Sequence, residues 1–277
     1  MNTRYIKYLL FIFFCAGFIS CEDVVTVDLD TAAPRLVVDA SINWIKGTNG
    51  SRQKIVLTTT APYYSNGVPA VSGATVYIVN GVGTQFNFTE EEPGSGEYFC
   101  NDFFPELNQT YTLTIVNDGQ VYTATESLYP TPDIAYTTQD SEGGFLNEDY
   151  EVRFYYQDNA AQDNFYMHRF DSDVMPYPDY DVIDDEFFQG NMMFGIFSDE
   201  DLGPGKEIGI QLYGISERYY NYMNKLINIA EGGSGGGPFQ TPPVTVRGNL
   251  VNQTDSSNFA LGYFRLGEVA RLNYTVE

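Results

Sequence analysis

The chain has 277 residues, with 14 Lys and Arg against 37 Asp and Glu, and a formal net charge of −23 at pH 7. A surface this acidic repels nucleic acid and anionic lipid, because phosphate binding depends on Lys and Arg to displace counterions. The single histidine in the sequence also excludes a metalloprotease of the HExxH type, which needs two. The acidity favours solubility, and it is also compatible with calcium sites or a cationic partner.

The first 20 residues have the pattern of a secretion signal. Arg4 and Lys7 precede an apolar run from Tyr8 to Ser20, which suits a signal peptide but is too short to cross about 30 Å of hydrocarbon. A small residue directly before Cys21 is the arrangement of bacterial lipoprotein precursors. We therefore predict a signal peptide over residues 1–20, lipidation of Cys21 and attachment to outer-membrane lipid. The alternatives are an ordinary secretory signal and a transmembrane anchor.

Residues 21–34 are polar and acidic, and we predict that they form a tether. Glu22 and Asp23 directly follow the lipidated cysteine and resemble the surface-export signals of Bacteroidota lipoproteins. They predict display at the cell surface, with retention in the inner leaflet as the alternative.

Residues 35–128 have the pattern of a β-sandwich. Apolar and polar residues alternate from Leu36 to Trp44, the period of a strand with one buried face. Similar short runs follow, separated by turn pairs such as Asn80-Gly81 and Asp118-Gly119, which favour hairpins because glycine accepts a positive φ. We predict an N-terminal β-sandwich of immunoglobulin or fibronectin size.

The two prolines between Tyr129 and Asp133 predict a domain boundary, because proline cannot donate to a strand ladder. Residues 133–277 are predicted to form a second sandwich-like, mainly-β domain with one inserted helix. That helix spans residues 216–230, with Ser216 as its N-cap and glycines after its end. Its buried stripe is predicted to run through Tyr219, Met223 and Leu226.

An acidic, irregular insertion lies between two predicted strands of the C-terminal domain. Clustered carboxylates are the ligands that calcium prefers, so this insertion is a candidate calcium site, the one cofactor that the sequence suggests. Its alternative is a solvated loop held open by charge repulsion. The candidate ligands are Asp181, Asp184, Asp185 and Glu186.

Several apolar side chains are candidates for binding a partner. Tyr220 and Ile227 lie beside the predicted buried stripe of the helix and add more apolar surface than a solvated helix requires. Exposed tyrosines can also stack on sugar rings. The alternative is that these residues pack on the N-terminal sandwich. The full candidate set is Tyr63, Tyr64, Tyr220, Ile227 and Phe239.

No catalytic group is predicted. Cys100 ends a strand-like stretch and is most simply a buried apolar residue. His168 lies in a strand pattern, and the sequence contains no G-x-S-x-G nucleophile motif. Paired carboxylates could serve a glycosidase only if a cleft held them at a fixed separation.

From Cys21 to the end, the chain resembles the Bacteroidota lipoproteins catalogued as domain of unknown function 4249. The matching stretches include CEDVVTVDLD, LVVDASI, TYTLTIVNDGQVYTATESL and GGGPFQTPPVTVRGNL followed by LGYFRLGEVA. The resemblance implies no established activity and no catalytic residues. Members are often encoded beside TonB-dependent outer-membrane transporters, which implies an accessory role at the cell envelope.

Two functions follow as expectations. The favoured one is a non-enzymatic, lipid-anchored accessory subunit of a TonB-dependent outer-membrane transporter. The alternative is a free-standing glycan-binding lipoprotein at the cell surface.

Overall fold

The computed structural model describes residues 33–62, 65, 67–230 and 245–277. The described part is mainly β, as predicted, with one helix. None of it forms a helix long and apolar enough to cross a membrane. The elements are β1 (Leu36–Ile45), β2 (Gln53–Thr59), β3 (Thr75–Asn80), β4 (Gln85–Glu90), β5 (Glu97–Cys100), β6 (Thr110–Asn117), β7 (Gln120–Tyr129), β8 (Ile134–Gly143), β9 (Asp149–Gln157), β10 (Phe165–Ser172), β11 (Asp179–Asp184), β12 (Met192–Asp199), β13 (Glu207–Ile215), α2 (Glu217–Ala230), β14 (Val251–Asn252) and β15 (Leu261–Thr275).

Eight strands form a closed sheet in the order β15-β1-β2-β5-β4-β3-β6-β7, in which β7 pairs back with β15. Alternate side chains of these strands face inward and form one buried apolar cluster, which includes Ile42, Leu57, Ile78 and Leu113. The predicted β6–β7 hairpin is present. Asp118 (φ 47°) and Gly119 (φ 73°) form its turn, and both take the positive φ that a two-residue turn requires.

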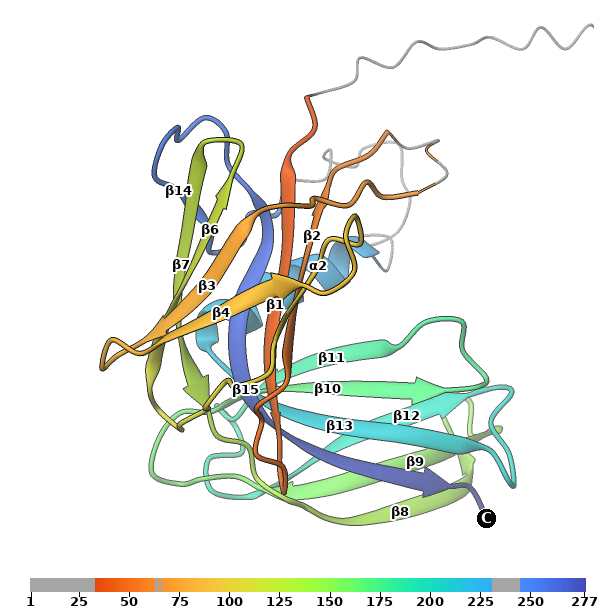
Figure 1. Ribbon diagram of the computed structural model, residues 1–277. Helices are drawn as coiled ribbons and strands as arrows, with labels where there is room; N and C mark the ends of the chain where they lie inside the picture. Colours follow the sequence, from red (N-terminus) through yellow and green to blue (C-terminus); the bar gives the residue numbers. More distant parts are fainter. Residues whose placement is uncertain (1–32, 63–64, 66, 231–244) are drawn as a thin grey trace, which may run out of the picture. The chain divides into compact units, whose positions relative to one another are not determined.

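The long C-terminal strand β15 pairs with β1, β13 and β7, and Figure 1 shows it running through both halves of the chain. Its first part runs parallel to β1 from Leu261 to Val269, and its last part runs antiparallel to β13 from Val269 to Thr275. Gly262 (φ 87°) lies so close to β1 that a Cβ there would overlap the Val38 carbonyl. The strand therefore belongs to both halves of the chain.

This pairing corrects the predicted domain organisation. The segments 35–128 and 133–277 are not two separate sandwiches, because Leu250, Phe264 and Leu266 lie in the first apolar cluster. Residues 34–277 form one compact unit. The chain does leave the eight-stranded sheet after β7, as the two prolines predict. The core of that sheet is nevertheless completed by β15, near the C-terminus.

The C-terminal half also contains a three-stranded antiparallel sheet in the order β12-β9-β8. Its inner side chains, including Phe154 and Phe197, share a second buried cluster with Phe170 on β10 and Ile210 on β13. Figure 1 shows this sheet as a layer next to β10, β13 and the end of β15. The prediction that the acidic insertion is irregular is therefore wrong in part, because the insertion contains the strands β11 and β12.

The predicted helix is confirmed as α2. Ser216 Oγ accepts a hydrogen bond from the Tyr219 backbone N–H at 3.2 Å and donates to Glu126 at 2.9 Å. The cap thus satisfies a free helix N–H and also ties the helix start to β7.

Candidate functional site

Six of the sequence-predicted site residues lie outside the described part of the structure. They are the lipidation and export residues Cys21, Glu22 and Asp23 and the aromatic candidates Tyr63, Tyr64 and Phe239. Their predicted roles are untested by the structure.

Helix α2 packs a different set of apolar side chains from the predicted one. Tyr219 and Met223 are buried as expected, but Tyr220 and Ile227 are half-buried against the same cluster. The Tyr220 ring lies 5.3 Å from that of Phe165, and burial raises its pKa, with the Asp184 carboxylate adding to the shift. Leu226, expected on the buried stripe, is 40% exposed. The helix therefore packs Tyr220 and Ile227, which were predicted to be free, and leaves Leu226 and Ile229 exposed.

The four candidate calcium ligands do not converge. Asp185 is buried and accepts a hydrogen bond from the Asn164 backbone N–H at 2.8 Å, whereas the Asp181 side chain is 65% exposed and lies near His168. Burial raises the pKa of Asp185, which disfavours the charged form that a cation would need. The Asp184 carboxylate accepts a hydrogen bond from the Glu186 backbone N–H at 3.2 Å. No group of three or more acidic, His or Cys side chains suited to a metal occurs among the described residues.

An unpredicted feature is the outer face of the small sheet, where apolar side chains are exposed on the two edge strands β8 and β12 and flank the half-buried Tyr155 on β9. Tyr155 on β9 is paired with Tyr136 on β8 and with Phe194 on β12. The Tyr136 and Tyr155 rings stack with centroids 4.5 Å apart and planes 15° apart, and the Phe194 ring is 5.8 Å from Tyr155. We call the set Tyr136, Tyr155, Met192, Phe194 and Ile196 the aromatic face.

The aromatic face is open to solvent. Tyr136 is 49% exposed, Ile196 43% and Phe194 37%. The Arg153 guanidinium lies 5.7 Å from the Phe194 ring centroid and forms a salt bridge with Glu151. The positive charge next to the aromatic face is therefore neutralised. A sheet packed on one side normally carries polar residues on the other. Apolar residues on both faces of β12 are the sequence signal that could have revealed this surface.

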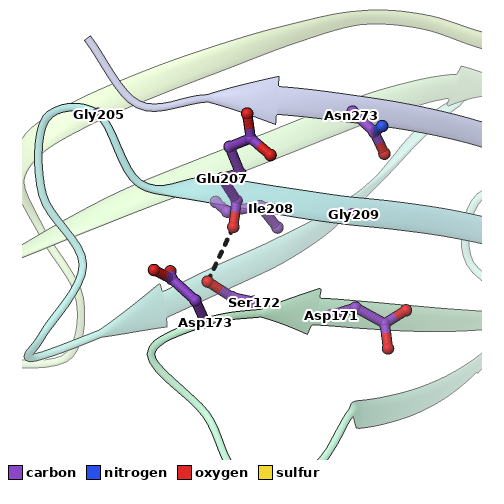
Figure 2. A pocket seen from close by; sticks show the side chains of 8 residues that line it. All are labelled: Asp171, Ser172, Asp173, Gly205, Glu207, Ile208, Gly209 and Asn273. Carbon is purple, nitrogen blue, oxygen red and sulfur yellow. Dashed lines mark hydrogen bonds between the residues drawn. The ribbon is translucent and has the colours of Figure 1, made fainter.

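A shallow groove with a volume of about 540 Å³ lies along the ends of β10, β13 and β15 (Figure 2). Three carboxylates line it, from Asp171, Asp173 and Glu207. Two of them are already compensated, because Arg169 donates to Asp171 at 2.7 Å and Lys206 to Asp173 at 3.1 Å. The groove is therefore a weak candidate for binding a cation.

His168 cannot reach a dissolved substrate, because it is 1% exposed. Its Nε2 lies 3.0 Å from the Tyr156 hydroxyl, and its ring packs edge-on against Phe154. Gly195 on β12 covers it so closely that a Cβ would lie 2.8 Å from its Nδ1. The residue therefore belongs to the core beneath the small sheet.

The sequence matches the family described as "Domain of unknown function (DUF4249)" over residues 22–272. The chain belongs to the DUF4249 family. No curated protein matches this DUF4249 chain.

Among solved structures, the DUF4249 chain is similar to a two-domain fibronectin type III segment of chicken tenascin, with 11% identity over 65% of this chain and 90% of that one, and a TM-score of 0.21. A DUF4785 family protein from Legionella pneumophila matches with 10% identity over 67% and 53%, and a TM-score of 0.26. The FN1–FN3 domains of chicken CNTN1 match with 13% identity over 67% and 63%, and a TM-score of 0.24.

Cys100 of this DUF4249 chain is held in an unreactive state. Its side chain is 1% exposed, and burial, with a smaller effect of Asp102, raises the thiol pKa to about 11. Because the thiolate is the nucleophile, very little of the reactive form exists at neutral pH. The structure thus agrees with a packing role.

We expect Cys100 to resist alkylation in the native protein. With Cys21 replaced by Ser and the signal omitted, iodoacetamide at pH 8 should leave the folded chain unmodified and should label it once in denaturant, as measured by intact mass. Rapid labelling of the folded chain would show that the thiol is accessible.

Proposed function

We propose that this DUF4249 chain is a non-enzymatic, lipid-anchored protein of the bacterial outer membrane that acts as an accessory subunit of a TonB-dependent transporter. The lipoprotein signal ending at Cys21 supports the anchor, and Glu22-Asp23 support display at the cell surface. The family resemblance supports the link to a transporter. Both buried reactive side chains, His168 and Cys100, support a binding role over catalysis.

The observation that carries the proposal is the aromatic face. Tyrosine, phenylalanine, methionine and arginine are enriched at protein interfaces, and this surface combines Tyr136, Tyr155, Met192 and Phe194 with Arg153, which is the β9 partner of Ile196. Rigid aromatic rings bury large area with little loss of side-chain entropy. The buried inner side of the same sheet holds these rings in place, so the surface is organised before a partner binds.

Charge also favours this face as the docking surface. The chain as a whole carries a net charge of −23, and such a charge opposes close approach of another acidic protein. Met192, Phe194 and Ile196 place no charge on the outer side of β12, and Arg153 is paired with Glu151. An apolar partner surface can therefore approach here without desolvating an unpaired charge.

The anchor is tested by replacing Cys21 with Ala. The thiol of Cys21 is the only acceptor for lipid at the predicted cleavage site, so the variant should lose fatty-acid labelling and leave the membrane fraction. In the unaltered protein, protease treatment of intact cells should remove the chain. A Cys21→Ala variant that is still labelled, or a chain protected in intact cells, would contradict the anchor and the surface display respectively.

The docking surface is tested by the double substitution Tyr155→Ala and Phe194→Ala. Removing two central aromatic residues should lower co-purification of the transporter from mild-detergent membrane extracts about tenfold or more, as measured by quantitative mass spectrometry. Val251→Ala is the matched control, because Val251 is 55% exposed on β14 and lies outside the aromatic face. Undiminished transporter recovery with the double variant would refute the assignment.

The stacked pair Tyr136 and Tyr155 supports a second candidate, a glycan-binding lipoprotein, because sugar rings pack their C–H faces on aromatic rings. In that case Tyr136→Ala should abolish retention of the protein in gels containing neutral polysaccharide, and no transporter should co-purify with the unaltered chain. Transporter recovery without polysaccharide retention would reject the glycan function.

A further inference from the structure

Strand β12 has an unpaired edge. In the described part of the chain it pairs with β9 alone and ends the order β12-β9-β8. The pairing with β9 runs without a register shift from Met192 to Asp199, so β12 presents a regular row of backbone N–H and C=O groups. Such an edge is a template for another strand.

The other three edges are protected by means that proteins use against strand addition. β14 has only two residues. β8 contains two register shifts in its pairing with β9, and its Gln139 is bonded to Tyr274 and Glu277. β11 carries Asp179 and Asp181 and packs against α2.

β12 has none of these protections. Its sequence from Met192 to Ser198 contains no charged residue and no proline. Met192, Phe194 and Ile196 are exposed on the outer side, and Met193 and Phe197 are buried on the inner side. An apolar, regular and open edge is unusual in a stable protein unless a partner covers it.

We propose that β12 pairs antiparallel with β12 of a second copy of this chain. A two-fold axis at Gly195 would place Phe194 opposite Ile196 of the second copy and Met193 opposite Phe197. Apolar residues then meet apolar residues on both faces of the sheet. Two copies fit because an isologous contact needs a self-complementary surface, and this strand is self-complementary about its central glycine.

The residues next to the two ends of β12 allow a second copy to pair here. β12 ends on Asp199 and is followed by Glu200 and Asp201, whereas the uncharged residues Gln189, Gly190 and Asn191 precede its start. Antiparallel pairing places the acidic end of one strand beside the uncharged end of the other. The two chains therefore avoid direct opposition of like charges despite their net charge of −23.

The pairing has a defined end product. Each chain has one open edge of this kind in its described part, so two copies satisfy each other and no chain growth follows. The three-stranded sheet is doubled, and the aromatic faces of the two copies become one continuous surface. The dimer is independent of which partner that surface binds.

The test uses the mature chain with Cys21→Ser and sedimentation velocity across concentrations from about 1 to 100 μM, the range suited to a small interface. The expected result is a reversible shift from monomer to dimer. Ile196→Lys should raise the dissociation constant at least tenfold, because it places a charge against Phe194 of the second copy. Val251→Lys, which adds the same charge on β14, should leave the dimer unchanged.

A second variant tests the register of the β12 pairing and detects the dimer even when the two copies associate weakly, because a disulfide traps it. With Phe194→Cys and Ile196→Cys in one chain, mild oxidation should give a disulfide-linked dimer, whereas Val251→Cys should not. Thermal melting checks that each variant is folded. A chain that is monomeric throughout, a dimer that Ile196→Lys leaves intact, or open-ended aggregation would each overturn the proposal. Protection of β12 from hydrogen exchange only when a transporter is bound would assign the edge to that partner instead.

Discussion

The pairing of β15 with β1 and β13 is the constraint on which the rest of the structure depends. One strand supplies Phe264 and Leu266 to the N-terminal core and Ala270 to the core beneath the small sheet. Its parallel pairing with β1 joins the two ends of the described chain, and contacts this distant in sequence have a large loop-closure entropy to overcome. The closed eight-stranded sheet is therefore incomplete until the C-terminal strand has been made. The small sheet, and with it the aromatic face, is positioned by the core that β15 shares.

Local patterns in the sequence predict much of this fold. The alternation from Leu36 to Trp44, the turn at Asp118-Gly119 and the cap at Ser216 are all found, because each depends on neighbouring residues alone. The sequence does not reveal that residues 261–275 form one continuous strand. Gly267 suggests that the strand ends there, yet the residue lies inside β15. Glycine is needed at this position because a Cβ would overlap the Gly214 carbonyl of the neighbouring strand. That contact joins distant segments, so no local periodicity can indicate it.

The candidate site shows the same division. The acidic residues of β11 favour the prediction of an irregular loop, although Asp179 and Asp181 alternate with the half-buried Tyr180 and Val182 as in a strand. β12 is missed by the sequence analysis because apolar residues occupy both of its faces, so that its sequence has no period of two. The aromatic face needs three strands in register, and only the tertiary structure supplies that. Helical spacing predicts Tyr220 and Ile227 as docking candidates, but it gives no information on β10 and β11, which lie beside the helix.

Native-state hydrogen exchange followed by mass spectrometry tests most directly the claim that β15 makes the chain one cooperative unit. The amides of β1, β13 and β15 should exchange through the same global opening, with one free energy and one denaturant dependence. A separate opening of lower free energy for the amides of β9, β10 and β13, with those of β1 and β6 still protected, would show instead that the two halves unfold independently.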